Sequence, residues 1–256
     1  MLSRDNMQDN GSVARTAVVS YARLRDEVLA RWIEDTVAFP SSMVDRITPE
    51  TTLEAQELVV STVGVDDHWA VVTEPFMQWI VQDTFCNGRP PLEQVGVQFV
   101  ADVRSYELMK TRLLNASHSA LGYLGSLAGY HDTDEAMGDP LIRAYLARLM
   151  NTEVTPLLPE TPGIDLAAYK RTLLERFANP AIKDQLARLC ARGSSKVPTF
   201  LLPSIREALE QGRPHALLAL AVAGWFRYLR GVDDAGRAPP WPPATRQSAT
   251  FSSCRR

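Results

Sequence analysis

Apolar residues recur at helical spacing between Tyr106 and Tyr130, and no proline interrupts the segment. This pattern predicts one long helix. Lys110, Asn115 and His118 share an arc on one side of that helix at about 100° per residue. The other, broad side collects apolar residues, namely Leu113, Ala116, Ala120, Leu124 and Leu127. The helix therefore combines an apolar face with a small polar cluster.

Glycines at positions 122, 125 and 129 continue the polar arc towards the end of the helix. A glycine inside a helix costs about 1 kcal/mol relative to alanine, so this stripe indicates close approach to the backbone by a ligand or another helix. We interpret the polar half of the arc as a site and the glycine half as the room beside it. The alternatives are a core histidine, glycines that only pack helices, and a lysine that reaches solvent.

The rest of the chain changes from a mixed to a helical pattern after Asp102. Before it, we expect helices from Ser12 to about residue 35 and from Thr52 to residue 58. Extended segments of a small sheet are predicted at 37–39, 40–48, 70–73 and 95–100. Beyond it, capping residues and prolines predict helices at 140–151, 166–178, 181–191, after Ser204, and at 214–230.

Composition is ordinary for a globular protein, with 45% hydrophobic and 22% charged residues. The net charge of −3 includes no basic block, which argues against a nucleic-acid partner. The three cysteines fit neither a zinc spacing nor a disulfide framework. The amino terminus lacks a secretory signal, and the longest apolar run (216–225) is about half a membrane span. We therefore expect a cytoplasmic protein without membrane contact.

Acidic residues gather next to His131, at Asp132, Asp134 and Glu135. Such a group has the composition of a metal site. It lies in one short polar loop before a predicted helix, however, and this position favours helix capping and solvated charge. We therefore predict no metal.

Four separate stretches carry a family resemblance: DNMQDNG (5–11), FPSSMVDRITP (39–49), VVTEPFMQWIVQD (71–83) and KTRLLNASHSALGYLG (110–125). Together they resemble the long-chain polyol dehydrogenase family, which includes mannitol 2-dehydrogenase and fructuronate reductase. The resemblance covers residues 3–236 and is greatest to mannitol 2-dehydrogenase. In this family the catalytic signature is a lysine, an asparagine five residues later and a histidine three residues after that. Here these are Lys110, Asn115 and His118.

The resemblance implies a mainly α fold, the multi-helical C-terminal domain of the long-chain mannitol dehydrogenase type, which is similar to that of 6-phosphogluconate dehydrogenase. It also implies a small β component and a remnant of a Rossmann-type domain. We expect residues 1–70 to be the last part of the nucleotide-binding domain and residues 71–236 to be the helical substrate and catalytic domain. The proline-rich residues 237–256 are expected to be a disordered tail.

Enzymes of this family move a hydride between NAD(P) and a sugar alcohol or ketose without a metal. A base must take the hydroxyl proton while donors hold the developing alkoxide. The base would be Lys110, whose amine can act if apolar surroundings and a neighbouring cation lower its pKa. Amide donors would be Asn115 and Asn6, and His118 would orient the substrate or form a hydrogen bond with the reacting oxygen.

The resemblance further implies substrate contacts from Val44, Asp45, Arg188 and Lys196. From the residues alone, Asp45 fits an exposed ion pair with its neighbour Arg46 equally well. Arg188 and Lys196 fit solvated charges at helix ends. The runner-up activity is that of a fructuronate reductase, since it shares the lysine, asparagine and histidine pattern.

No strand in the sequence is followed by a Gly-x-Gly-x-x-Gly turn and a helix, so the pyrophosphate-binding motif for NAD or NADP is not present. Relatives also continue with a different terminus after about residue 236. A truncated or frame-shifted gene would explain both departures. The alternative to a complete enzyme is accordingly a catalytically incomplete remnant that still folds and binds a polyol weakly.

Overall fold

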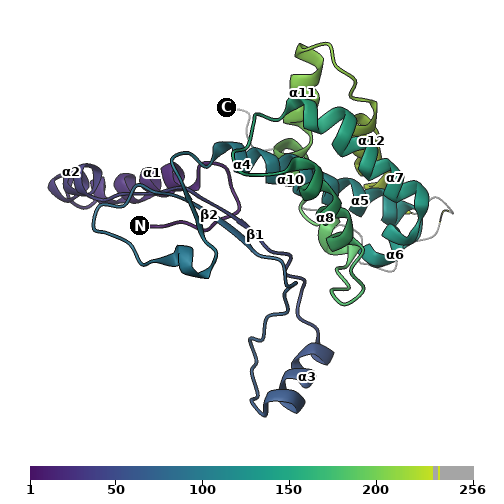
Figure 1. Cartoon of the computed structure of the whole chain (residues 1–256), viewed down its shortest axis with the longest axis horizontal. Coiled ribbons are helices and arrows are strands. Elements are labelled where there is room, and N and C mark those ends of the chain that lie inside the picture. Colours follow the sequence, from purple (N-terminus) through teal and green to yellow (C-terminus); the bar gives the residue numbers. More distant parts are fainter. Residues whose placement is uncertain (233–235, 237–256) are drawn as a thin grey trace. The chain divides into compact units, whose positions relative to one another are not determined.

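The computed structural model describes residues 1–232 and 236, so the predicted tail at 237–256 lies outside the described residues. Within the described part the chain is mainly helical with a small three-stranded sheet, as the sequence predicts (Figure 1). None of the helices described is both long and apolar enough to cross a membrane. The chain divides into two compact units. Unit 1 comprises Met1–Thr48, Val71–Lys110 and Pro159–Thr161, and unit 2 comprises Pro49–Ala70, Thr111–Leu158 and the residues from Pro162 onward.

The sheet of unit 1 is formed by segments that are far apart in the sequence. β1 (Ser42–Asp45) pairs antiparallel with β2 (Gln78–Gln82), which pairs parallel with β3 (Gln98–Val100). Strands predicted at 37–39 and 70–73 are wrong, because both segments have irregular backbone. Runs of β-branched residues favour a strand only where a partner strand is available.

Two helices precede the sheet where the sequence pattern predicts one. α1 (Asn10–Arg23) ends before Asp26, whose side chain accepts the backbone N–H groups of Val28 and Leu29 and thereby starts α2 (Glu27–Thr36). Arg23 of α1 pairs with Glu34 of α2 at 2.7 Å. The two helices therefore fold back on each other, and the prediction of a continuous helix through residues 24–26 is wrong.

A further helix, α3 (Leu53–Val63), begins where the sequence predicts. The Thr52 hydroxyl accepts the backbone N–H of Ala55, which makes Thr52 the N-cap. The helix runs beyond the predicted end at residue 58 and stops at Gly64, which has a φ of 73°. No residue of α3 is buried.

The predicted long helix is confirmed as an unbroken succession of α4 (Arg104–Met109), a π-helical segment η2 (Lys110–Asn115) and α5 (Ala116–Leu127). The π-helical segment was not predicted. α5 lies at the centre of unit 2 and is buried on nearly all sides, against α9 (Leu186–Cys190), α10 (Gly193–Phe200) and α12 (Ala216–Tyr228). A helix that is buried all round forms the core of a domain.

The glycine stripe packs helices and leaves no room for a ligand. A Cβ built at Gly122 would lie 2.9 Å from the Cβ of Leu189, and one at Gly125 would lie 2.9 Å from a methyl group of Leu186. Gly129 lies beyond the end of α5 with a φ of 93°. Our interpretation of the stripe as room beside the site is therefore wrong.

The remaining helices of unit 2 surround α5 or pack on its neighbours. They are α6 (Thr133–Gly138), α7 (Pro140–Arg148), η3 (Leu149–Val154), η4 (Thr155–Leu157), α8 (Leu166–Phe177) and α11 (Leu202–Glu210). Unit 1 also contains a 3-10 turn at Leu92–Val95. Asp139 and Asp165 cap α7 and α8 as predicted. The helix predicted at 181–191 is shorter, because turns occupy the residues before α9, and Ser204 lies inside α11 instead of capping it.

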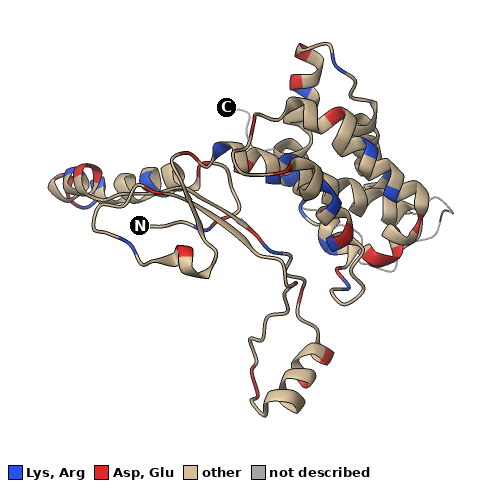
Figure 2. Cartoon of the chain, in the orientation of Figure 1, with Lys and Arg blue, Asp and Glu red and all other residues tan. Residues whose placement is uncertain are grey.

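Acidic and basic residues are interspersed on the helices of unit 2 (Figure 2). Asp132 and Glu135 form a reciprocal capping box at the start of α6. The Glu135 carboxylate accepts the backbone N–H groups of His131 and Asp132, which lowers its pKa. These contacts confirm the expected capping role of the acidic loop.

Candidate active site

Lys110 opens the π-helical segment and is 6% exposed. Its amine donates a hydrogen bond to the side-chain oxygen of Asn6 at 2.6 Å. These residues are 104 positions apart in the sequence but both belong to unit 1. The structure therefore brings together the predicted base and one of its predicted amide partners. π-helical turns are rare and frequently occur at functional sites.

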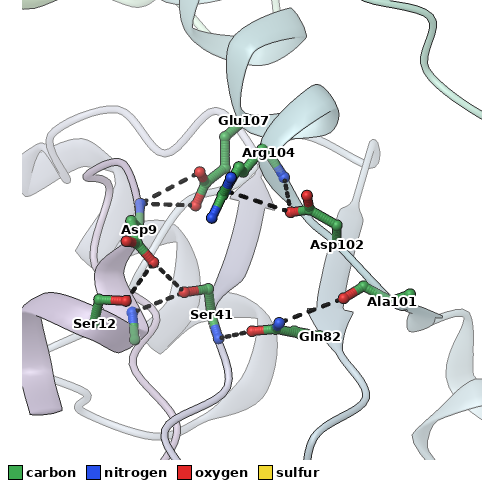
Figure 3. A network of polar contacts seen from close by, with 9 residues as sticks. Asp9, Ser12, Ser41, Gln82, Ala101, Asp102, Arg104 and Glu107 are labelled. Carbon is green, nitrogen blue, oxygen red and sulfur yellow. Dashed lines mark hydrogen bonds and ion pairs between the residues drawn. The ribbon is translucent and has the colours of Figure 1, made fainter.

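The loop that carries Asn6 is fastened to the body of unit 1 at several points. Figure 3 shows the backbone N–H of Asp9 facing both carboxylate oxygens of Glu107, at 3.2 and 3.3 Å. The Asp9 carboxylate in turn accepts the hydroxyl groups of Ser12 and Ser41 at 2.8 and 3.1 Å. Burial raises the pKa of Glu107, against the smaller opposing effect of the bond from Asp9. Glu107 lies one helical turn before Lys110 on the same helix.

The end of strand β1 places the next pair of predicted residues. Asp45 is 3% exposed and pairs in register with Gln78 of β2, whereas Val44 is half-buried. The neighbouring Arg46 donates from its Nε to the backbone carbonyl of Glu74 at 2.9 Å. The alternative of an exposed ion pair at a turn is wrong for Asp45, because its side chain is buried.

Asn115 and His118 belong to unit 2. Asn115 closes the π-helical segment and is 7% exposed, and its side-chain N–H₂ is buried without a hydrogen-bond partner among the described residues. His118, one turn further along α5, packs its half-buried ring against that of Phe177 with 4.3 Å between centroids. An unpaired buried amide donor is costly, so the Asn115 amide is available to a bound oxygen.

Arg188 and Lys196 form a second group in unit 2. Arg188 of α9 makes a bidentate ion pair with Asp184, which is 2% exposed. The Lys196 amine donates to the backbone carbonyls of Arg188 and Leu189 at 3.2 and 3.0 Å. Burial, and secondarily the charge of Arg188, lowers the pKa of Lys196. The alternative of freely solvated helix-end charges is wrong for both residues.

Comparison with family models matches two successive parts of the chain. Residues 1–94 match the mannitol dehydrogenase Rossmann domain, and residues 102–250 match the mannitol dehydrogenase C-terminal domain. The second match alone spans more than half of the 256 residues. The chain belongs to the mannitol dehydrogenase family.

Individual relatives of the family are similar over nearly the whole chain. The mannitol 2-dehydrogenase of Aspergillus terreus is 50% identical over 240 residues, and mannitol dehydrogenase 2 of Saccharomyces cerevisiae is 53% identical over 239 residues. Each alignment covers 93% of this chain and 48% of the relative. The chain thus spans about half the length of the curated relatives that it matches.

Two solved structures of similar enzymes share its fold. The Pseudomonas fluorescens mannitol 2-dehydrogenase in complex with NAD and D-mannitol superposes with a TM-score of 0.86 at 49% identity. The superposition covers 96% of this chain and 50% of the Pseudomonas fluorescens chain. A D-sorbitol dehydrogenase gives the same TM-score at 40% identity, with 95% of this chain and 50% of the other covered.

Two residues next to the family signature were missed as site components by sequence reasoning. Glu107 and Asn10 contact the loop that holds Asn6, although neither was predicted to have a role. The signal for Glu107 was present, since an acidic residue one turn before a buried lysine is unusual on an apolar helix. Asn10 gave little local signal, because two of its three hydrogen bonds go to Ser42 on β1, 32 positions away.

Proposed function

We propose that this member of the mannitol dehydrogenase family carries the catalytic and substrate-binding part of a polyol oxidoreductase. The reaction is the transfer of a hydride between NAD(P) and a sugar alcohol or ketose, of the mannitol to fructose type. The relatives named mannitol 2-dehydrogenase and D-sorbitol dehydrogenase support a polyol as substrate. They favour it over the sugar acid of a fructuronate reductase.

The hydrogen bond between buried Lys110 and exposed Asn6 carries the proposal. Oxidation of a secondary alcohol removes a proton from oxygen and a hydride from carbon. Lys110, in its neutral form, accepts the proton, while the oxygen of Asn6 holds the amine in place at 2.6 Å. Replacing this amine removes the proposed base.

The amide of Asn115 supplies the donor for the developing alkoxide. Its buried N–H₂ has no partner among the described residues, so no existing hydrogen bond has to break when it binds a substrate oxygen. His118 orients that oxygen, with its ring held against Phe177. We assign substrate hydroxyl contacts to Arg188 and Lys196 in unit 2.

Val44 and Asp45 are assigned the remaining substrate contacts. Asp45 lies at the end of β1, where a buried carboxylate is suited to accept hydrogen bonds from hydroxyl groups. Val44 offers its half-buried surface beside that carboxylate.

The described residues do not supply a complete dinucleotide site. Among the strands of the described residues, only β3 leads directly into a helix, and its connecting residues Ala101, Asp102 and Val103 contain no glycine to cradle a pyrophosphate. NAD is nevertheless the cofactor named in the complex of the Pseudomonas fluorescens enzyme. We therefore assign proton transfer and oxygen binding to this chain's own residues and derive no step through the dinucleotide.

A chimera tests the proposal directly. This chain replaces the matching half of the Pseudomonas fluorescens enzyme, and NAD reduction with D-mannitol is followed by absorbance, with Lys110→Met as the variant. We expect turnover in the chimera and a loss of at least about 100-fold in kcat in the variant, the size of a general-base contribution. Unchanged turnover in Lys110→Met would refute the role of the base.

The isolated chain distinguishes an enzyme from an incomplete remnant. NADH fluorescence is titrated with the chain alone, and mannitol oxidation is measured in the same sample. Binding together with oxidation indicates an autonomous enzyme. Absence of both, with an active chimera, identifies the chain as a catalytic part that needs further polypeptide.

A further inference from the structure

We propose that Asn10 is a positioning residue that holds Asn6 against the amine of Lys110. This inference rests on the function proposed above, in which Lys110 is the base. The side chain of Asn10 forms hydrogen bonds with Asp5 and Ser42. It acts on the residue immediately before Asn6 and on the strand next to it.

The side chain of Asn10 is 1% exposed and makes three hydrogen bonds. Its N–H₂ donates to the backbone carbonyl of Asp5 at 2.9 Å and to that of Ser42 at 2.7 Å. Its oxygen accepts the backbone N–H of Ser42 at 3.0 Å. The amide thus forms hydrogen bonds with the backbone N–H and the backbone carbonyl of Ser42 in β1. Its N–H₂ also donates to the Asp5 carbonyl in the loop. An amide is the side chain with this combination of donors and acceptor.

The bond to Asp5 fixes one end of the loop and Glu107 fixes the other. Asn6 follows Asp5 directly, and the backbone N–H of Asp9 is held by the Glu107 carboxylate. Between these two attachments the chain has few ways to move, because short closed loops have little conformational freedom. The Asn6 side chain is therefore presented to the Lys110 amine from a loop that is tied at both ends.

Loss of the Asn10 amide removes hydrogen-bond partners of backbone groups on both sides, buried ones at Ser42 and an exposed residue's carbonyl at Asp5. Asp5 loses its donor, and Ser42 loses a donor and an acceptor from the same side chain. The attachment at Glu107 remains, so the loop stays near the sheet but its first half gains freedom. The expected consequence is a wider distribution of distances between Asn6 and Lys110, at little change elsewhere.

Lysine NMR measures this consequence without relying on enzyme activity. The chain contains four lysines, at positions 110, 170, 183 and 196. A sample labelled with 13C at the lysine Cε therefore gives four signals, and Lys110→Met identifies the one of interest. We expect Asn10→Ala to move the Lys110 signal and its titration midpoint in the same direction as Asn6→Ala, by at least half as much. The other three signals should stay in place.

A double variant tests whether Asn10 acts through Asn6. Once Asn6 is alanine, the additional change Asn10→Ala should leave the Lys110 signal where Asn6→Ala put it. Ile80→Val is the matched control, because it removes a buried methyl group from β2 in the same unit without touching the loop. It should lower the melting temperature and leave all four lysine signals unchanged. Asn10→Asp, which keeps the acceptor for Ser42 and removes both donors, serves if alanine prevents folding.

Two results overturn the proposal. One is a Lys110 signal in folded Asn10→Ala and Asn10→Asp that coincides with the wild-type signal throughout the titration. The other is a shift that adds to that of Asn6→Ala in the double variant. If Asn10→Ala moves the signal but Lys110→Met retains turnover in the chimera, the positioning stands and the proposed function fails.

Discussion

Glu153 caps the amino end of α12 from outside that helix. It is 4% exposed, and its two carboxylate oxygens accept the backbone N–H groups of Leu217 at 2.9 Å and Leu218 at 2.8 Å. The residue before the helix, His215, provides no side-chain cap. Glu153 therefore satisfies two N–H groups that have no partner within the helix, and its charge faces the positive end of the helix dipole.

Replacing this carboxylate by an amide gives a calculable loss. A hydrogen bond to a charged group contributes about 1.5–3 kcal/mol, against about 0.5–1.5 kcal/mol for a neutral one. Glutamine has one side-chain oxygen for the two backbone N–H donors, and its N–H₂ cannot accept a hydrogen bond from either of them. We expect Glu153→Gln to lower the free energy of unfolding by about 2–3 kcal/mol. For a chain of this size each kcal/mol corresponds to about 2–4 °C, so Tm should fall by about 4–12 °C.

A thermal melt followed by circular dichroism checks this prediction. Glu175→Gln is the matched control, since Glu175 is exposed on α8 and its replacement should change the free energy of unfolding by no more than about 0.5 kcal/mol. The difference should persist in high salt, because the Glu153 carboxylate is shielded from solvent. If Glu153→Gln melts at the same temperature as Glu175→Gln, the capping explanation is wrong.

Three further predictions concern α5, α4 and α10. Gly122→Ala should destabilise the chain by about 1–3 kcal/mol in urea unfolding, since the new Cβ meets that of Leu189 at 2.9 Å; a gain in stability would contradict close packing. Burial raises the pKa of Glu107, so its contribution to stability is present at acid pH and lost as pH rises. Glu107→Gln should reduce that loss in unfolding measured from acid to neutral pH, and an unaltered pH profile would refute this. Burial lowers the pKa of Lys196, so the unfolded chain binds more protons and stability rises towards alkaline pH. Lys196→Met should remove that rise, and equal slopes of stability against pH would argue against it.

Signals that depend on neighbouring residues predicted the structure well. Thr52, Asp139 and Asp165 each accept a backbone N–H two or three residues further along, as expected of N-caps. Such bonds form within one turn of chain, so the sequence around them is sufficient. The same holds for the capping box of Asp132 and Glu135.

Features that depend on distant partners were predicted poorly. The segment 70–73 has the composition of a strand, yet β2 forms at Gln78–Gln82 because that segment finds β1 as its partner. The glycines of α5 are equally compatible with a ligand and with a helix from their spacing alone. Only the position of Leu186 and Leu189 on α9 decides between the two.

The site residues were predicted from the family resemblance. Helical periodicity alone predicted only that Lys110, Asn115 and His118 share one side of a helix. The pairing of Lys110 with Asn6 joins residues 104 positions apart, which no local pattern indicates. Arg188 and Lys196 were expected near a substrate, but their contacts with Asp184 and with helix-end carbonyls emerge only from the packing of α9 and α10. The roles of these residues remain predictions.

The π-helical segment gives a physical reason for the spacing of the family signature. In a regular α-helix, residues five positions apart differ by about 140° around the axis and point to different sides. A π-helix is defined by i→i+5 hydrogen bonds, which place such residues on the same turn. The segment begins at Lys110 and ends at Asn115, so the local widening applies to the proposed base and the proposed amide donor. A uniform 3.6-residue period cannot show this alignment. The departure from regular geometry therefore falls at the two residues for which we propose proton transfer and oxygen binding.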